Sequence, residues 1–214
     1  MPHAYSIDDL HSSFLPILRA ALASLELPQT GIALDLASGA GNKLALLREA
    51  LGEHMQLLAL DIDQQALVLS KKAFPFEAVK HIVADAHTLP LDSTSMDTVF
   101  CIAAFGLFHD QRQVLAELRR ILKPGAGLLL SLTEMRWCER IAWPSDLLNS
   151  LAAAYQPSTK SWQHSLPASV DISSDYAALL LHAGFSHIHI RALSLIHISE
   201  PTRRTPISYA VFCL

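Results

Sequence analysis

The distribution of apolar and polar residues divides the chain into a regular part, up to residue 134, and a looser part after it. In the regular part, short apolar runs alternate with longer segments in which apolar residues recur every three or four positions. The short runs are typical of strands buried on both faces, and the longer segments are typical of amphipathic helices. This alternation predicts a three-layer α/β fold, in which a doubly wound parallel sheet lies between two layers of helices.

Strands and helices can be placed individually in the regular part. Glycine and proline stand where each helix should end, at Gly52, at Pro75 and at the Pro124–Gly125 pair. The predicted strands cover residues 31–37, 55–63, 81–86, 97–105 and 127–134, and the helices between them cover residues 42–52, 64–74 and 111–125.

The looser part differs in composition and gives a less regular pattern. Residues 135–170 are richer in Trp, Pro and Ser and only partly helical in pattern, which favours an insert that caps a substrate site. A further helix and strand follow within residues 171–192, and the helical pattern within residues 1–30 favours an N-terminal lid. We therefore predict a single domain over residues 1–192, with its core at residues 31–134.

Residues 193–214 are set apart from this domain. LSLIHISEPTR resembles the peptide translated from a sequencing-library adapter, and ISYAVFCL resembles the peptide translated from the flow-cell end of the same oligonucleotide. We expect this segment to be an artefact and the authentic chain to end near Ala192, without the last strand of its sheet. The alternative is a natural tail. Because ISYAVF has the pattern of a strand, we expect it to fill the vacant position in either case.

Composition and charge exclude several classes of protein. The chain is 51% hydrophobic with a net charge of −4, which fits a soluble globular protein and not a nucleic-acid binder that works by bulk charge. No apolar run reaches the roughly 18 residues of a membrane-spanning helix, and the N-terminus lacks the pattern of a signal peptide. The 3 cysteines are too scattered for a disulfide framework or a zinc site, so we predict no metal and a cytoplasmic location.

The first predicted strand runs into a glycine-rich loop, LDLASGAG at residues 34–41. In doubly wound sheets, ligands bind at the carboxyl ends of the strands, where the strand order reverses. Gly39 and Gly41 allow a tight turn and a close approach of the backbone to a ligand, and the next helix offers free N–H groups. The second predicted strand ends in Asp61, whose carboxylate can accept hydrogen bonds from both hydroxyls of a ribose. The pattern therefore predicts a nucleoside site.

Two kinds of nucleoside ligand can be compared. A dinucleotide requires G-x-G-x-x-G, but Leu44 stands at the position of the third glycine. Asp35 would lie beneath the loop, where its charge repels a pyrophosphate and attracts a sulfonium or an ammonium group. S-Adenosylmethionine carries both cations and no phosphate. The alternative role for Asp35 is to cap the loop by hydrogen bonding.

Four segments of the chain resemble, in the same order, the motifs of the class I S-adenosylmethionine-dependent methyltransferases. LDLASGAG resembles the first motif of that family, LLALDID its acid-ended second strand, HIVADAHTLPLDSTSMDTVF its third motif, and VLAELRRILKPGAGLLL its signature helix, turn and fifth strand. The resemblance covers residues 30–134 and implies a Rossmann-like sheet of seven strands, with residues 31–134 binding S-adenosylmethionine. The branch that includes ubiquinone and menaquinone C-methyltransferases is the most similar, which implies methyl transfer to a small-molecule acceptor.

The resemblance also implies roles for individual residues around the cofactor. Asp35, Gly39 and Gly41 would line its methionine end. Asp61 would hold the ribose, and Ile62 would pack on the adenine.

Further contacts are implied for the adenine and the sulfonium. Asp85 would accept a hydrogen bond from the adenine amino group, and the Ala86 N–H would face the ring. Ile102 and Ala103 would form the floor near the sulfonium. Ala37 stands where the family has its first glycine; its small side chain should still fit, with weakened binding.

Catalytic residues give a weaker signal than cofactor contacts. In-line displacement at an activated carbon needs mainly positioning and exclusion of water, and it needs a general base only if the acceptor must lose a proton. His109, after the fourth strand, and Glu134, at the end of the fifth, are the candidates; a loop histidine and a solvated strand end are the alternatives. An NAD(P)-dependent oxidoreductase and a catalytically inactive cofactor-binding partner protein remain as alternative functions. The acidic net charge argues against a nucleic-acid acceptor.

Overall fold

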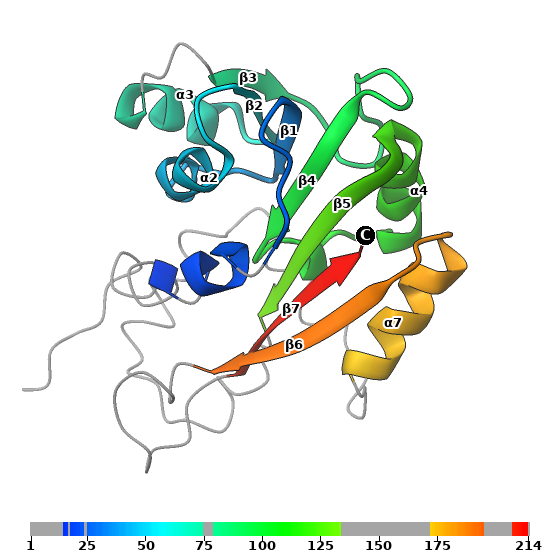
Figure 1. Ribbon diagram of the computed structural model, residues 1–214. Helices are drawn as coiled ribbons and strands as arrows, with labels where there is room; N and C mark the ends of the chain where they lie inside the picture. Colours follow the sequence, from blue (N-terminus) through cyan, green and yellow to red (C-terminus); the bar gives the residue numbers. More distant parts are fainter. Residues whose placement is uncertain are drawn as a thin grey trace, which may run out of the picture.

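The structure of the chain is a computed structural model that describes residues 15–16, 18–23, 25–74, 79–133, 172–194 and 207–213. Its centre is a sheet with the strand order β3-β2-β1-β4-β5-β7-β6 (Figure 1). The chain runs outwards from β1 to β3 and then returns to the other side of β1, so the strand order reverses between β1 and β4. The predicted doubly wound parallel core is confirmed. Its parallel strands are β1 (Gly31–Leu36), β2 (Met55–Asp61), β3 (Val79–Val83), β4 (Met96–Ile102) and β5 (Leu122–Thr133).

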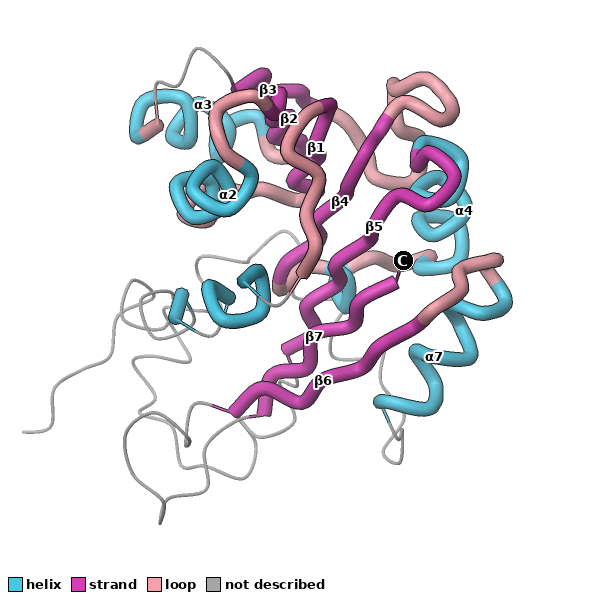
Figure 2. The backbone as a smooth tube through the Cα atoms, viewed as in Figure 1, coloured by secondary structure: helices cyan, strands magenta, loops and turns pink. Residues whose placement is uncertain are grey.

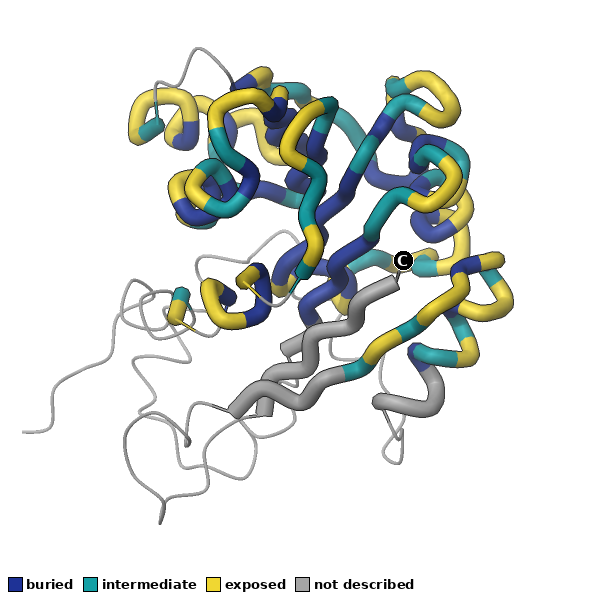
Figure 3. The backbone as a smooth tube through the Cα atoms, viewed as in Figure 1, coloured by how far each residue is buried: buried dark blue, intermediate teal, exposed yellow. Residues whose placement is uncertain are grey.

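Helices cover both faces of the parallel strands. On one side lie α2 (Leu44–Leu51) and α3 (Gln64–Ala73), and on the other lie α4 (Gln111–Ile121) and α7 (Ile172–His182), as Figure 1 and Figure 2 show. Successive residues of β1 enter different cores, since Leu34 and Leu36 pack with α4 and α7, whereas Ala33 packs with α2. The inner strands β1, β2 and β4 are therefore buried on both faces along most of their length (Figure 3), which explains their apolar runs, whereas the edge strand β3 is only partly buried.

The described part of the predicted N-terminal lid belongs to the core. Residues 18–23 are helical, and Leu18, Ala21 and Leu22 are buried in the cluster that includes α2. Residues 1–14 and the predicted cap at 135–170 lie outside the described residues.

The boundary between α4 and β5 differs from the prediction. The helix ends at Ile121, and Leu122 already pairs with Met96. The register then shifts, so that the next pairing on β5 is at Gly127, and residues 123–126 form an irregularity. Pro124 has no N–H for the ladder, and Gly125 takes a positive φ of 75° without strain. The helix therefore ends before the predicted residue 125, and the proline–glycine pair lies in the irregularity that follows it.

The other predicted strands also have shifted ends, and the first two end slightly early, at Leu36 and Asp61. The third begins earlier, at Val79, and ends at Val83. The fourth ends at Ile102, and Phe105 opens the short 3-10 helix η1 (Phe105–Leu107).

The far edge of the sheet is antiparallel. β7 (Ile207–Cys213) lies between β5 and β6 (Ile188–Ser194) and pairs with both. This is the position expected for ISYAVF on its strand pattern alone, whatever the origin of residues 193–214. None of the helices that the structure describes combines the length and the hydropathy needed to cross a bilayer.

Candidate functional site

The loops that follow the parallel strands meet at one edge of the sheet, around the switch between β1 and β4. Each predicted site residue ends a parallel strand or follows one, which brings them to this edge. Glu134 lies outside the described residues. The structure places the following predicted site residues at this edge: Asp35, Ala37, Gly39, Gly41, Asp61, Ile62, Asp85, Ala86, Ile102, Ala103 and His109.

Asp35 is a fully buried carboxylate beneath the glycine loop. It shares a face of β1 with Ala33, which packs on the α2 side, and 0% of it is exposed. Neither oxygen accepts a hydrogen bond from a described residue, and the Lys43 ammonium lies 3.9 Å from Oδ2. Burial raises the pKa of Asp35 to about 6, the Lys43 charge opposes this shift, and the Asp61 charge adds to it. A buried carboxylate without hydrogen bonds is costly, which points to a bound cation or water at this position.

Asp61 holds the glycine loop from the neighbouring strand. Its Oδ2 accepts a hydrogen bond from the Gly39 N–H at 2.8 Å, and its Oδ1 accepts one from the Asp63 N–H at 2.9 Å. Because each carboxylate oxygen has two lone pairs, Asp61 can keep both bonds and still accept from two hydroxyl groups.

Gly39, Gly41 and Ala37, the small residues of the glycine loop, differ in the space around them. A Cβ on Gly41 would lie 2.3 Å from the Ser70 Oγ of α3, so glycine is required there for packing. A Cβ on Gly39 would meet nothing within 4 Å, so the space beside Gly39 is open to a ligand. Ala37 also has a positive φ, of 55°, which costs a residue with a Cβ on the order of 1 kcal/mol. This strain explains why the motif that LDLASGAG resembles has a glycine at the position of Ala37.

Asp85 follows β3 and is engaged by His87. The His87 backbone N–H donates to Asp85 Oδ1 at 2.9 Å, and the His87 Nδ1 lies 2.6 Å from the same oxygen. These two hydrogen bonds hold the pKa of Asp85 below its usual range, so the carboxylate is ionised at neutral pH.

The remaining predicted contacts differ in exposure. Ile62 is 69% exposed, an unusual state for a large apolar side chain that directly follows a buried strand. Ala103 is exposed, whereas Ala86 and Ile102 are buried. The Ile102 side chain packs in the α2-side core, so Ile102 can reach a ligand only through its backbone.

Two residues at this edge were missed by the sequence patterns. Lys43 is the residue that caps α2, and a cation at a helix N-terminus opposes the helix dipole; that mismatch was a readable signal for a nearby carboxylate. His87 stands two residues after Asp85, a spacing at which an Asp side chain often bonds the local backbone. His109 is exposed, and its ring lies 3.9 Å from that of His87.

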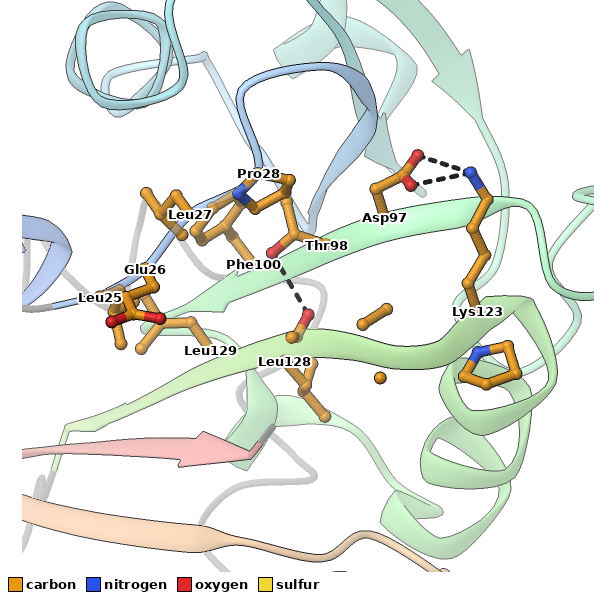
Figure 4. Close-up of a pocket in the computed structure, with 14 residues that line it drawn as sticks. Leu25, Glu26, Leu27, Pro28, Asp97, Thr98, Phe100, Lys123, Leu128 and Leu129 are labelled. Carbon is orange, nitrogen blue, oxygen red and sulfur yellow. Dashed lines mark hydrogen bonds and ion pairs between the residues drawn. The ribbon is translucent and has the colours of Figure 1, made fainter.

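A cavity of about 370 Å³ lies at the opposite end of the sheet, over β4 and β5 (Figure 4). Phe100 and Leu129 form part of its apolar wall, and the Asp97–Lys123 ion pair stands at one side. None of the predicted site residues lines this cavity. Among the described residues, no group of three or more His, Cys, Asp or Glu side chains could hold a metal ion.

The carboxyl edge fits a cationic nucleoside better than a phosphorylated one. Asp35 and the buried Ser38 Oγ lack hydrogen-bond partners among the described residues, and a Cβ on Gly39, in the same loop, would meet open space. A carboxylate in this position favours a positive group and disfavours a pyrophosphate.

Comparisons with known proteins agree with this chemistry. A family model described as a methyltransferase domain matches residues 34–130. The ubiquinone/menaquinone biosynthesis C-methyltransferase of Acidiphilium cryptum is 32% identical over 176 residues, which cover 75% of this chain and 68% of that protein. The chain belongs to the S-adenosylmethionine-dependent methyltransferases. The predicted family is thereby confirmed, and S-adenosylmethionine is the cofactor of that family.

Two further methyltransferases show how far the likeness extends. The malonyl-[acyl-carrier protein] O-methyltransferase of a Marinomonas species is 34% identical over 116 residues, covering 54% of this chain and 43% of that protein. The chain thus spans less than half the length of the first curated relatives it matches. A solved S-adenosylmethionine-dependent methyltransferase from Aquifex aeolicus has the same fold, with a TM-score of 0.66 and 16% identity over 97% of this chain and 93% of that chain.

Proposed function

We propose that this chain transfers a methyl group from S-adenosylmethionine to a small-molecule acceptor. The observation that carries the proposal is the arrangement of two carboxylates around one glycine loop. Asp35 is buried beneath the loop without a hydrogen-bond partner among the described residues, and Asp61 is bonded to Gly39 within it. When bound, the cofactor supplies a methyl group that its cationic sulfur activates.

The residues at this edge bind and orient the nucleoside. Asp61 accepts hydrogen bonds from the ribose hydroxyls, and Asp85 accepts one from the adenine amino group. The Ala86 N–H faces the ring. The exposed Ile62 covers the adenine with apolar surface, which explains why a side chain of this kind lies in solvent. These contacts fix the cofactor so that its methyl group faces an acceptor.

The glycine loop acts on the methionine end of the cofactor. Gly39 and Gly41 let the backbone approach it, and Ala37 takes the same left-handed conformation at some cost in strain. Asp35 favours the cations through its charge and by ordering a bridging water. Ala103 and the Ile102 backbone form the floor beside the sulfonium.

The acceptor we propose is a small apolar or aromatic molecule in the cytoplasm. The relative named for quinone biosynthesis supports a small apolar acceptor, and the other is named for a malonyl group carried on an acyl-carrier protein. The net charge of −4 favours a neutral or cationic partner over a nucleic acid. His109 is the proposed residue for an acceptor proton because it is exposed beside Asp85 and His87, and Glu134 is the second candidate.

Calorimetry tests the cofactor half of this proposal. Titration with S-adenosylmethionine and with S-adenosylhomocysteine should give saturable binding to one site, whereas NADH should give none. Binding of NADH in place of both would overturn the proposal in favour of the oxidoreductase, which the comparisons do not support.

Turnover tests the catalytic half. Release of S-adenosylhomocysteine should depend on an added quinol or phenol acceptor, and His109→Ala should lower kcat more than it raises KM if His109 accepts the proton. Tight binding with no turnover of any acceptor would instead identify a catalytically inactive partner protein.

A further inference from the structure

His87 is the residue most closely engaged with Asp85, and it is itself only 8% exposed. Its ring and its backbone N–H both engage Asp85 Oδ1, at 2.6 Å and 2.9 Å. No described residue donates a hydrogen bond to the other oxygen, Oδ2, and 45% of the Asp85 side chain is exposed. One oxygen therefore fixes the carboxylate, and the other is available to a ligand.

The tautomer of His87 is set by helix α4. The backbone N–H of Asp110, which caps α4, is directed at the His87 Nε2 at 3.4 Å. Because an N–H can only donate, the Asp110 N–H pairs with Nε2 as the acceptor, which assigns the ring proton to Nδ1. Nδ1 is thus the donor to Asp85.

The position of the His87 ring is fixed on several sides. Gln113 Nε2 donates to the His87 carbonyl oxygen at 2.9 Å. The ring stacks on that of His109, with centroids 3.9 Å apart, and meets Phe108 edge to face at 5.9 Å. A side chain held by its backbone, both ring nitrogens and two ring neighbours has little freedom to turn.

We propose that His87 is a positioning residue that aims Asp85 at the 6-amino group of adenine and so makes the site selective for adenine over a 6-oxo purine. The inference rests on the proposed function and deepens it. A carboxylate can only accept hydrogen bonds, so a fixed Oδ2 attracts an amino group and repels an oxo group. Without the His87 donor, the carboxylate can rotate away from a 6-oxo group, and the repulsion that gives selectivity is lost.

The test compares S-adenosylhomocysteine with S-inosylhomocysteine, whose base has an oxo group at position 6 and a protonated N1. Calorimetry at one pH should show that the wild-type chain binds the adenosine compound at least tenfold more tightly. His87→Phe keeps the stacking on His109 but removes the donor, so the preference should fall to about threefold or less. His87→Asn restores a donor and should recover most of the preference.

Two further results decide between positioning and packing. In an Asp85→Ala background, His87→Phe should leave the ratio of the two dissociation constants unchanged, because His87 acts only through Asp85. If His87→Phe keeps the full preference in the wild-type background, the inference is overturned while the proposed function stands. If the wild-type chain binds neither compound, the proposed function falls and takes the inference with it.

Discussion

At the amino end of the parallel sheet, Asp97 accepts hydrogen bonds from the Lys123 ammonium and from the Ile32 N–H, each at 2.8 Å. At the carboxyl end, Asp35 accepts none from any residue that the structure describes. Partial burial opposes ionisation of Asp97, but these hydrogen bonds outweigh it and hold the pKa of Asp97 below its usual range. Burial of Asp35 is not offset in this way, and its pKa rises to about 6.

The difference separates a structural carboxylate from one suited to a ligand. Asp97 ties three strands together and has its hydrogen-bonding capacity used within the protein. Asp35 accepts no hydrogen bond from the described residues, and only the Lys43 ammonium, 3.9 Å from Oδ2, offsets its charge there. The same contrast holds for the glycines, since a Cβ on Gly31 would lie 2.2 Å from Asp97 Oδ2, whereas one on Gly39 would meet nothing within 4 Å.

Exchange of these two glycines for alanine should give the largest effects. Gly31→Ala should lower the free energy of unfolding by roughly 4 kcal/mol, because the new methyl group displaces Asp97 and the φ of 113° disfavours any Cβ. Gly39→Ala should cost only about 1 kcal/mol of stability but should weaken cofactor binding markedly. Denaturant unfolding and calorimetry on both variants measure the two effects. Equal losses of stability in the two variants would contradict the difference inferred between the amino and carboxyl ends of the sheet.

Asp61→Ala should weaken S-adenosylmethionine binding by about 3 kcal/mol, the scale of two charge-assisted hydrogen bonds. Asp61→Asn is the matched control, because its carbonyl oxygen can still accept from the Gly39 N–H and keep the loop closed. An intermediate loss of affinity for the Asn variant would separate loop closure from ribose binding. Unchanged affinity in the Ala variant would refute the ribose role.

Asp35→Asn should stabilise the chain at neutral pH. The pKa of Asp35 is raised on folding, so its contribution to stability is fully present below about pH 4 and declines as the pH rises through 6. The variant lacks this decline, so its advantage over the wild type should grow between pH 4 and pH 7 by up to about 3 kcal/mol. Cofactor binding should weaken at the same time.

Asp97→Asn should change the stability of the chain at neutral pH in the opposite direction to Asp35→Asn. Because the folded pKa of Asp97 is lowered, its contribution is present above the unfolded value near pH 4 and is lost as the pH falls. The Asn variant should therefore be less stable than the wild type at pH 7. Thermal unfolding scans across the pH range would contradict the comparison if both variants shifted in the same direction.

Ala37→Gly should give the smallest effect, a gain of about 0.5 kcal/mol in stability. Removing the Cβ relieves the left-handed conformation, and the greater freedom of glycine in the unfolded chain offsets part of the gain. Cofactor affinity should rise slightly or stay the same. A loss of stability in chemical denaturation would show that Ala37 is not strained.

The parallel core could be predicted from the sequence because the apolar pattern and the position of the motifs both indicated the same fold. Runs such as MQLLALD are apolar on both faces, and the glycine and acid motifs follow the strands at the edge where ligands bind. Element ends were less predictable, since Pro124–Gly125 signals both a helix end and a bulge. Only the pairing of Leu122 with Met96 distinguishes them, and that pairing joins residues far apart in the chain.

The candidate site was predicted in its motif residues but not in the side chains that tune them. Asp35 and Asp61 lie at strand ends and could be read from the pattern, whereas Asp85 was implied by the family resemblance. The approach of Lys43 to Asp35 and the stacking of His87 on His109 depend on how α2 and α4 pack, which no local pattern encodes. The adapter-like origin of residues 193–214 stays a prediction, which resequencing of the parent genomic locus tests by yielding a different sequence after about Ala192.

The hydrogen bond from Gly39 to Asp61 joins the glycine loop to the end of β2 through the protein's own atoms. Fixing the backbone of a mobile loop at the moment of binding would cost about 1 kcal/mol or more for each residue ordered. Here that ordering is completed when β1 and β2 pair, so ligand capture loses little conformational entropy at this loop. Sheet formation thus preorganises the binding edge, and mutations that loosen the β1–β2 register should lower affinity without touching a contact residue.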